Sequence, residues 1–588
     1  MKDRVVLPPR PVAAAVLLCS TAAAAAAAHH LRGWHPALAA VVAAVTVGPL
    51  VAATWPRFAT DTLGLHGTVL PGVPGGGDGW LLGRSRQLAA AMGAKRTCFL
   101  LSEWRAAAGT PNYQVWLAGV RRVVLSHPAD VAHVLGRVCP PRDASWMRAF
   151  GLPISSKVLI LTTGGEHAAA RRLLAAPLAD DAVLRAVAAG VAADVNAEGA
   201  GGGGGAALGR ALAAAADAGA PADVAAATQA MTLRVVHRVM VSAPATDGVD
   251  FGPAIAGLVP LLVPLTLVPL PAVFARRRLG RVRAIGDLYR RCLAHHEAAR
   301  RAAYAAGAWP RVPPRDVLDV LLADADRGGL YADRDRLAAD WMVLMMTGVD
   351  STARSIEWGV YLLCTHPDVQ ARVLTEVSAA LASPPASDGA PPPTDGDPPP
   401  PPIPLPTLTA LPYLHAVWRE TLRLYPPAAS GGSRRLATDV VLPSSGAVLP
   451  AGTAVKMPHH VAMHSPHNFP RPDAFEPRRW LGGAPAGRHA GGAASCPSPA
   501  PAAAGGGRGV EGGGGQAAWR PFGLGPLSCI GRRLAEVQWK AAVAAVVAKY
   551  ELRLDADAPA VEPLDALSLK PSHMRVRLRR RGGKGTGA

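Results

Sequence analysis

The chain has 588 residues, of which 61 are Lys or Arg and 42 are Asp or Glu, so its formal net charge is +19. Half of the residues are hydrophobic, which excludes global disorder, and the 62 Gly and 56 Pro follow no Gly-X-Y repeat, which excludes a collagen-like chain. The basic residues form no zinc-finger, RRM or helix-turn-helix pattern. We therefore expect no nucleic-acid partner; an anionic membrane surface or an acidic protein would suit a basic chain better.

The first 60 residues have the composition of an anchoring or targeting segment. Residues 12–28 and 36–55 carry no charge, and the second stretch is long enough to cross a bilayer as a helix. Asp3 is the only acidic residue before residue 61, as is typical of organellar transit peptides. We expect residues 1–60 to be either a membrane anchor or a cleaved transit peptide, and the sequence leaves both open.

Residues 61–582 are predicted to form one large domain that carries three low-complexity surface inserts. Long loops add little closure entropy, so a fold can carry them. The seven Cys show no paired spacing, which argues against a disulfide framework and leaves a single thiol available for another role. The predicted inserts are 194–223, rich in Gly and Ala, 383–406, rich in Pro, and 482–518, rich in Gly, Ala, Pro and Ser.

In chain order, alternating apolar residues predict strand structure at 113–125, and a helix follows over 127–137. A strand-and-turn region is predicted at 433–457. Between these two regions the periodicity is helical, so the predicted fold class is mainly α with a minor β-sheet region. The predicted helices are 165–178, 276–305, 334–364, 366–382 and 411–424.

Residues 258–274 are apolar but contain four prolines, which break a regular helix and argue against a membrane span. The stretch is either a loop in the core or a loop that dips into a membrane surface beside the basic residues that begin at Arg276. An exposed apolar patch of this size would need a partner. The second interpretation weakly favours a lipophilic substrate that enters from a membrane.

The strongest local signal is the segment 521–536, PFGLGPLSCIGRRLAE. Cys529 stands just before an amphipathic run, with Gly525 four residues before it and Gly531 two residues after it. Such a loop delivers a thiol to the start of a helix, where backbone N–H groups and the helix dipole lower the thiol pKa. Phe522 is placed to pack beside the sulfur and exclude water. The alternative is a buried structural cysteine.

Two residue pairs lie at helical spacing and are weak signals alone. Glu420 and Arg423 share a helix face, as do many solvated surface pairs. This pair gains weight from the later segment FEPRRW, where Arg479 would complete a buried Glu–Arg–Arg cluster. His167 and Arg171 also share a face and could both donate to an anion, or simply belong to a basic surface.

Polar residues interrupt the apolar helix predicted at 334–364. A small residue there lets a bulky ligand approach the helix, while a hydroxyl and a carboxylate can relay protons. The alternative is a helix bend filled by a Ser or Thr hydroxyl that bonds back to the helix backbone. The residues concerned are Gly348, Asp350, Ser351 and Thr352.

These elements, in this order, resemble the cytochrome P450 family of haem-thiolate monooxygenases. The resemblance covers roughly residues 80–580 and includes the strand–helix start at 113–137, Pro367–Gln370 and the late segment SLKPSHMRVRL. Each motif alone is weak or moderate, whereas the ordered set is highly specific. The resemblance implies a cytochrome P450 fold in which haem b lies between a distal helix and a proximal cysteine loop.

The resemblance also implies a role for each candidate residue. Cys529 matches the axial thiolate ligand of the haem iron, a ligand that favours O–O cleavage. The other matches are the haem-loop residues Phe522, Gly525 and Gly531, the structural triad Glu420, Arg423 and Arg479, the distal-helix Gly348 with the proton-delivering Asp350, Ser351 and Thr352, and the propionate contacts His167, Arg171 and Arg434.

Four positions depart from the family pattern. Ser351 stands where Thr is usual, which keeps the hydroxyl but loses the methyl that fixes its rotamer. His167 replaces a Trp and keeps a ring donor, and Arg478 replaces a Glu. Leu527 replaces a basic residue two positions before the cysteine, which removes one charge-assisted bond to a propionate. Arg520 is a candidate substitute for it.

The resemblance implies a monooxygenase that takes electrons from an NADPH-cytochrome reductase or a ferredoxin and inserts one oxygen atom of O₂ into a lipophilic small molecule. The segments CIGRRLAE and FEPRRWL look most like the mitochondrial group served by a ferredoxin, and His415 and Arg419 match its basic partner-docking face. We expect a membrane-associated protein of the endoplasmic reticulum or another internal membrane, with the mitochondrion as the alternative. An O₂-independent haem-thiolate isomerase or dehydratase and a non-catalytic haem-binding protein remain open.

Overall fold

The computed structural model describes residues 70–74, 84–117, 120–143, 157–197, 207–242, 272–307, 316–382, 403–481, 517–566 and 568–581. The expected anchor or transit peptide at 1–60 lies outside these residues. So do most of the Pro-containing stretch 258–274 and nearly all of the predicted inserts at 383–406 and 482–518.

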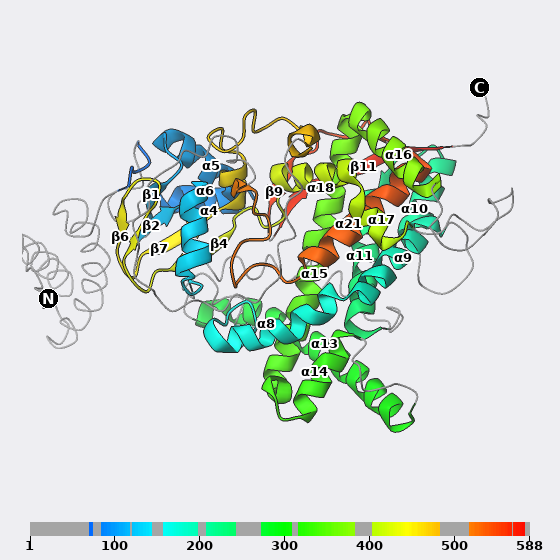
Figure 1. Cartoon of the computed structure of the whole chain (residues 1–588), viewed down its shortest axis with the longest axis horizontal. Helices are drawn as coiled ribbons and strands as arrows, with labels where there is room; N and C mark the ends of the chain where they lie inside the picture. Colours follow the sequence, from blue (N-terminus) through cyan, green and yellow to red (C-terminus); the bar gives the residue numbers. More distant parts are fainter. Residues whose placement is uncertain are drawn as a thin grey trace, which may run out of the picture.

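Helices dominate the described residues, which confirms the expected mainly α fold (Figure 1). In chain order they are α4 (Ser85–Gly93), α5 (Thr97–Ala108), α6 (Pro128–Ala132), η1 (His133–Val138), α8 (Gly164–Ala179), α9 (Asp181–Asn196), α10 (Ala207–Asp217), α11 (Val224–Val241), α13 (Ala272–Ala305), α14 (Val317–Asp326), η2 (Leu330–Ala332), α15 (Arg334–Thr365), α16 (Pro367–Ala382), α17 (Leu405–Ala410), α18 (Pro412–Leu424), α19 (His459–Met463), η3 (Pro477–Trp480) and α21 (Arg532–Lys549).

The strands form small sheets beside and behind the helices. The largest sheet has the order β1-β2-β7-β4 and is made of β1 (Tyr113–Leu117), β2 (Val120–Val124), β7 (Ala454–Met457) and β4 (Gly432–Arg435). Strands β2 and β7 are parallel, whereas the other pairs are antiparallel. The smaller sheets are β3 (Ala222–Asp223) with β11 (Arg575–Arg580) and β8 (Tyr550–Leu554), β5 (Val440–Val441) with β6 (Val448–Leu449), and β9 (Pro563–Asp565) with β10 (Leu569–Pro571).

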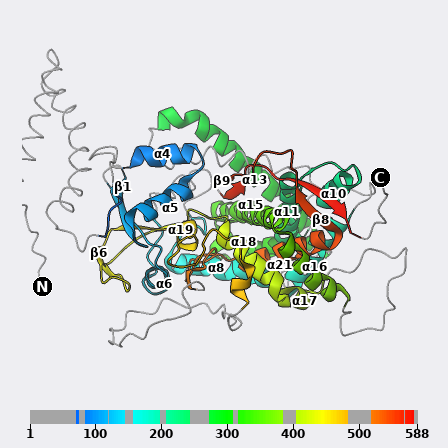
Figure 2. The ribbon, with the colours of Figure 1, turned by 90° about the horizontal axis from the view of Figure 1, so that it is seen from above.

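Helix α15 is the central element of the helical part (Figure 2). Most of its side chains are buried, as expected of a helix with apolar residues around much of its circumference. It packs against α11 along one side and α21 along another. Gly359 allows the closest approach, because a Cβ there would lie 2.6 Å from a ring carbon of Trp539, whose indole N–H donates to the Ser355 carbonyl oxygen at 2.9 Å.

The second half of the predicted insert at 194–223 differs from our expectation. Helix α10 and strand β3 occupy it, and both Leu208 and Leu212 are buried in the main core. These two residues lie four positions apart on one helix face, so their burial stabilises a helix in a stretch that otherwise consists mostly of Ala and Gly.

Helix α18 begins where its neighbour supplies a cap. Pro412 occupies the first helical turn, where a missing N–H costs nothing. The Glu376 carboxylate of α16 accepts the next two backbone N–H groups, from Tyr413 and Leu414, at 2.8 Å each. Helix α18 carries Glu420 and Arg423, so this cap fixes the position of the predicted triad.

Candidate functional site

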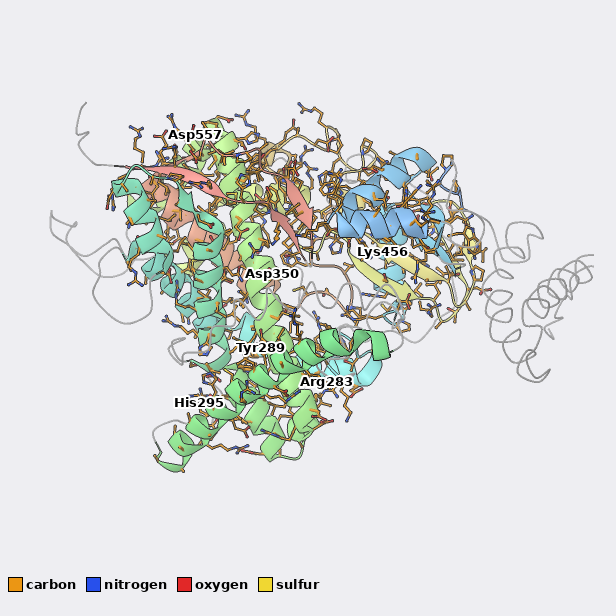
Figure 3. All side chains as sticks on the ribbon, turned by 180° about the vertical axis from the view of Figure 1, so that it is seen from behind. Arg283, Tyr289, His295, Asp350, Lys456 and Asp557 are labelled. Atoms are coloured by element: carbon orange, nitrogen blue, oxygen red, sulfur yellow. The ribbon has the colours of Figure 1, made fainter. Side chains whose placement is uncertain are left out.

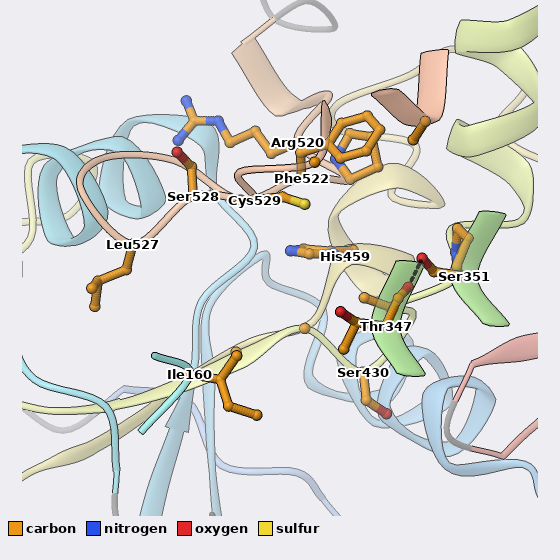
Figure 4. A pocket seen from close by; sticks show the side chains of 18 of the residues that line it. Ile160, Thr347, Ser351, Ser430, His459, Arg520, Phe522, Leu527, Ser528 and Cys529 are labelled. Atoms are coloured by element: carbon orange, nitrogen blue, oxygen red, sulfur yellow. Dashed lines mark hydrogen bonds between the residues drawn. The ribbon is translucent and has the colours of Figure 1, made fainter. Parts of the chain in front are cut away.

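A large cavity of about 1010 Å³ lies between α8, α15, the strands β4 and β7, and the loop before α21 (Figure 4). Its lining is mainly apolar, as in pockets that bind small organic molecules. One face of α15 forms a continuous wall, because residues spaced by three and four positions share a helix face. That face consists of Asp340, Val343, Leu344, Thr347, Gly348, Ser351, Thr352 and Ser355.

The loop before α21 presents Cys529 to this cavity (Figure 4). The Cys529 N–H donates to the Phe522 carbonyl oxygen at 2.9 Å, and the Ser528 N–H donates to the Gly525 carbonyl oxygen at 3.0 Å. Gly525 has a φ of +73°, and a Cβ there would overlap the carbonyl oxygen of Leu135. A glycine is therefore required for this close approach of two backbones.

Burial has the largest effect on the pKa of the Cys529 thiol. The Cys529 side chain is exposed to the cavity, and desolvation by the protein packed around the loop raises its thiol pKa. A backbone N–H of Gly531 and the guanidinium groups of Arg171 and Arg532 act in the opposite direction. Our expectation of a net lowered pKa is wrong because burial outweighs these groups. A coordinated metal cation would deprotonate such a thiol outright.

Aromatic side chains pack around the proximal side of this loop. The Phe522 ring lies 5.9 Å from Trp418 and 6.3 Å from Trp519, measured between ring centroids. Arg532 lies over the Phe522 ring at 5.8 Å. These contacts form a hydrophobic wall next to the sulfur, the position that the sequence predicts for Phe522.

The structure brings Glu420, Arg423 and Arg479 into one buried cluster. The Glu420 carboxylate accepts two bonds from Arg423 and one from Arg479, each at 2.9 Å. It also accepts the Trp480 indole N–H at 2.8 Å and the Glu476 backbone N–H at 3.0 Å. Glu420 and Arg423 have no exposed side-chain area, so water does not stabilise their charges. The ion pair and the surrounding hydrogen bonds stabilise them instead.

Gly348, Ser351 and Thr352 all line the cavity, as the sequence predicts for a ligand-facing helix segment. The Ser351 hydroxyl donates to the Thr347 carbonyl oxygen at 2.8 Å (Figure 4). Gly348 also faces α11, where a Cβ would lie 3.1 Å from a methyl carbon of Val236. The hydroxyl groups therefore lie at the cavity wall, close to the contact between Gly348 and α11.

Asp350 lies on α15 (Figure 3). Unlike its neighbour Ser351, it is not among the residues that line the cavity. Its carboxylate accepts the hydroxyl of Ser568 and lies 3.3 Å from Nε of Arg354. The guanidinium of Arg354 is in turn bound by Glu357. The predicted acid–alcohol pair is thus divided between two faces of α15.

Two cationic side chains, Arg171 and Arg434, and the imidazole of His167 line the cavity together. Burial first, and then Arg142, Arg171 and Arg434, lower the pKa of His167 to about 4, so its imidazole is neutral near pH 7. The Arg171 guanidinium donates to the carbonyl oxygen and the hydroxyl of Ser528, next to the cysteine. This arrangement suits an anionic group at the cavity edge.

Sequence reasoning did not identify Arg142, which belongs to the same cluster. Burial, Arg434 and Arg171 together lower the pKa of Arg142 to about 10. It also missed Asp340 and His459, which line the cavity from α15 and α19. None of the three stands in a recognisable local motif, and only the fold brings them to the cavity.

The predicted docking face is only partly present. Arg419 is buried, and its guanidinium carbon lies 4.0 Å from the ring centroid of Trp480 and 4.8 Å from that of Trp519. The expectation of Arg419 on an exposed basic face is therefore wrong. His415 is part-exposed and lies 3.0 Å from the Glu536 carboxylate.

Comparison with known proteins supports one family. A family model described as "Cytochrome P450" matches residues 74–578. The chain is 32% identical over 229 residues to "25-hydroxyvitamin D-1 alpha hydroxylase, mitochondrial" of Homo sapiens, 39% of this chain and 36% of that protein. It is 31% identical over 266 residues to "Cytochrome P450 4A7" of Oryctolagus cuniculus, and the alignment covers 45% of this chain and 43% of that protein. It is 30% identical over 252 residues to "Cytochrome P450 monooxygenase sphH" of Aspergillus fumigatus, and the alignment covers 43% of this chain and 40% of that protein. The alignments thus span less than half of each of these relatives.

Proposed function

The chain belongs to the cytochrome P450 family, whose members bind haem b through a cysteine thiolate, and we propose that it is a haem-thiolate monooxygenase acting on a lipophilic small molecule. The observation that carries this proposal is one largely apolar cavity shared by the Cys529 thiol and the hydroxyl-bearing face of α15. The names of two relatives, a hydroxylase and a monooxygenase, favour this activity over an O₂-independent one.

The residues around the cavity fit haem b. Arg434 is buried and Arg142 and Arg171 are part-buried, and no carboxylate accepts from any of the three within the described part of the chain. Propionate groups would supply the missing negative charge. A Cβ at Gly531 would lie 3.9 Å from the Cys529 sulfur, so the glycine keeps the space beside the sulfur open to a planar ring.

Bound haem supplies the iron-centred activation of O₂, and the protein supplies position, charge and exclusion of water. We assign Cys529 as the iron ligand, held by the Phe522 and Gly525 backbone contacts. Ser351 and Thr352 would hold protons at the cavity wall, on the side that the substrate occupies. Asp350 would serve them only after its side chain leaves Ser568, because it lies on a different face of α15.

The test is the absorption spectrum of the reduced, carbon-monoxide-bound full chain. We expect a red-shifted Soret band typical of thiolate ligation, and we expect Cys529→Ala to abolish it. Cys139→Ser is the matched control, because Cys139 lies outside the cavity lining. If Cys529→Ala retained the thiolate band, the ligand assignment would be wrong.

We further infer that the protein is associated with an internal membrane and accepts electrons from an NADPH-cytochrome reductase or a ferredoxin. The charge of +19 would favour an acidic partner, and the name of the human relative describes it as mitochondrial. Reconstitution with each donor in turn tests this inference. The correct donor should give product with NADPH and O₂ both consumed, and failure with both donors would contradict the monooxygenase proposal.

A further inference from the structure

We propose that Lys95, at the turn between α4 and α5, binds a carboxylate of the substrate at the edge of the cavity, so that the substrate is a lipophilic carboxylic acid. This inference rests on the proposed function and names the chemical class of its substrate. Lys95 is exposed, and it lines the cavity together with the apolar residues Ala89 and Met92 of α4. A cation that borders an apolar cavity suits a ligand with an apolar body and an anionic end.

The ammonium group of Lys95 is available to such a ligand. Its Nζ makes no hydrogen bond or ion pair with any residue that the structure describes. The neighbouring charges are already engaged: Arg96 lies 3.9 Å from the Glu103 carboxylate. The Asp565 carboxylate also borders the cavity, but it accepts a backbone N–H at 2.7 Å and a serine hydroxyl at 3.2 Å. An anionic ligand would therefore meet a lysine that no carboxylate of these neighbours has neutralised.

The backbone of Lys95 adopts a conformation that disfavours a side chain. Helix α4 ends in a Schellman motif, in which the Lys95 N–H donates to the Met92 carbonyl oxygen at 3.1 Å and the Arg96 N–H donates to the Ala91 carbonyl oxygen at 2.7 Å. Lys95 has a φ of +57°, in the left-handed region that this motif usually fills with glycine. The turn alone would thus favour glycine, and strained positions of this kind are common where a ligand binds.

The turn that carries Lys95 is fixed to the β9–β10 hairpin. The Lys95 carbonyl oxygen accepts the Asp565 N–H of β9 at 2.7 Å. Ala566, the next residue of the hairpin, lines the cavity as Lys95 does. The ammonium group therefore extends from a fixed base at a boundary of the cavity, and a bound carboxylate would hold one end of the substrate there.

The Lys95 position is separate from the cationic cluster beside the cysteine loop. The cations that lower the pKa of Arg142 are Arg434 and Arg171, after burial. Arg171 also acts on the Cys529 thiol, whereas Lys95 acts on neither group. A carboxylate at Lys95 would therefore leave that cluster free and place the apolar body of the substrate in the rest of the cavity.

Lys570 of β10 is the rival for this role. Burial, then Arg354 and Lys95, lower the pKa of Lys570, so the two lysines lie close enough to repel each other. However, Lys570 does not line the cavity, and the carboxylates of Asp350 and Glu357 already act on it in the opposite direction. The observations favour Lys95, and the second positive charge nearby would add to its attraction for an anion.

The experiment measures the binding of labelled acids to the full chain by equilibrium dialysis at low ionic strength. The probes are dodecanoate, with a linear body, and lithocholate, with a fused-ring body, and each is compared with its own methyl ester. We expect at least one acid to bind about 3- to 10-fold more tightly than its ester, the range of an ion pair near a protein surface. The acid that shows the preference identifies which body fits the cavity. Added salt should reduce the preference because it screens exposed charges.

Lys95→Gly is the decisive variant. It removes the ammonium group, while glycine adopts the left-handed conformation without strain, so the fold should not lose stability. The preference for the acid over its ester should disappear, whereas Lys95→Arg should keep it because the positive charge remains. Arg96→Gln, at the adjacent exposed cation outside the cavity lining, is the matched control and should keep the preference. Thermal unfolding checks that each variant is folded.

The inference would be overturned if neither acid bound more tightly than its ester, or if Lys95→Gly kept the preference. Loss of the preference in Lys570→Gln, with Lys95→Gly unchanged, would assign the carboxylate to Lys570 instead. The reduced carbon-monoxide spectrum of the unmodified chain separates these outcomes from failure of the proposed function. A thiolate band without any preference for an acid leaves the monooxygenase assignment intact and refutes carboxylate binding at Lys95.

Discussion

At the residue scale, helix α15 divides its polar side chains between two faces. Ser351 and Thr352 line the cavity, whereas Asp350 is held by Ser568 and Arg354 on the other side. Consecutive residues on an α-helix point about 100° apart, so adjacent positions need not share a site. A proton held by Asp350 therefore reaches the cavity only through a side-chain movement or a route around the helix.

Ser351→Ala should uncouple O₂ reduction from substrate oxidation. If the Ser351 hydroxyl holds a proton at the cavity wall, its loss should lower product formation about 10²-fold while NADPH is still consumed. Ser351→Thr should retain coupling because the hydroxyl remains. The measurement is product formed per NADPH consumed.

Ser355→Ala is the matched control for Ser351→Ala. Ser355 lines the same cavity one turn further along α15, and its hydroxyl donates to the Thr352 carbonyl oxygen at 2.7 Å. Coupling should be nearly unaffected in this variant. Equal coupling in the two alanine variants would mean that the Ser351 hydroxyl has no part in proton delivery.

Asp340 should give the folded protein a stability that falls as pH rises from about 4 to 6. Burial raises the pKa of its carboxyl from 3.8 to about 6, although the Leu159 N–H and the Tyr331 hydroxyl both donate to it. In this pH range the folded state binds more protons than the unfolded state, so deprotonation favours unfolding. Below about pH 4 both states are protonated, and above about pH 6 both are charged.

Chemical unfolding of Asp340→Asn across this range measures the effect. Relative to Asp340→Asn, the free energy of unfolding of the native chain should fall between about pH 4 and 6 and then stay constant. Asp335→Asn, an exposed position on the same helix, is the control and should show no such shift. A constant difference for Asp340→Asn would refute the raised pKa.

At the element scale, the cluster of Glu420, Arg423 and Arg479 joins α18 to η3. Glu420→Ala would leave Arg423 buried without its counter-charge, which should cost about 3–5 kcal/mol in the free energy of unfolding. Arg478→Ala, at the exposed neighbour of Arg479, should change stability by no more than about 0.5 kcal/mol. Chemical unfolding checks both values, and a similar small effect for both would show that the buried cluster does not stabilise the fold.

Sequence patterns predicted most of the elements that position the site, because their information is local. Helices 334–364 and 411–424 correspond to α15 and α18, where apolar periodicity is strong. The sequence predicts one strand region at 113–125, whereas the structure has two antiparallel strands there, β1 and β2. The alternating pattern alone does not show where one strand ends and the next begins. Helix α10 was not predicted because it lies in an Ala- and Gly-rich stretch, although the spacing of Leu208 and Leu212 indicates its buried face.

Side-chain directions were harder to predict because they depend on distant parts of the chain. Arg419 lies on the predicted helix, but it is covered by Trp480 and Trp519, which follow much later in the sequence. Arg142 gains its place from a bridge to Arg434 and a contact with Leu527. Periodicity identifies which residues share a face, whereas only the fold decides what that face meets.

At the scale of the whole molecule, one cavity is assembled from segments throughout the chain. Arg171 of α8 contacts Ser528, 357 residues later, and β2 pairs with β7 across most of the sequence. The low-complexity stretches fall between these segments, where added loop length costs little closure entropy. The site is therefore formed by tertiary contacts between helices and strands that lie far apart in the sequence.

Removing residues 2–60 should release the protein from membranes. Residues 36–55 carry no charge and are long enough to span a bilayer. Within the described ranges, no helix is both long and apolar enough to do so. After expression in a eukaryotic cell, we expect the full chain in the membrane fraction after an alkaline wash and the shortened chain in the supernatant, with its reduced carbon-monoxide spectrum unchanged.

A second variant decides between the possible sources of membrane association. Serine in place of the Leu and Val residues of 258–268, in the full chain, should leave the protein in the membrane fraction if the N-terminal segment is the anchor. If the shortened chain still sediments with membranes, and only the combined variant is released, the apolar stretch at 258–274 is the attachment instead. N-terminal sequencing of the recovered full-length product separates an anchor from a transit peptide, because a retained anchor begins near residue 1 and a cleaved peptide leaves a new N-terminus downstream.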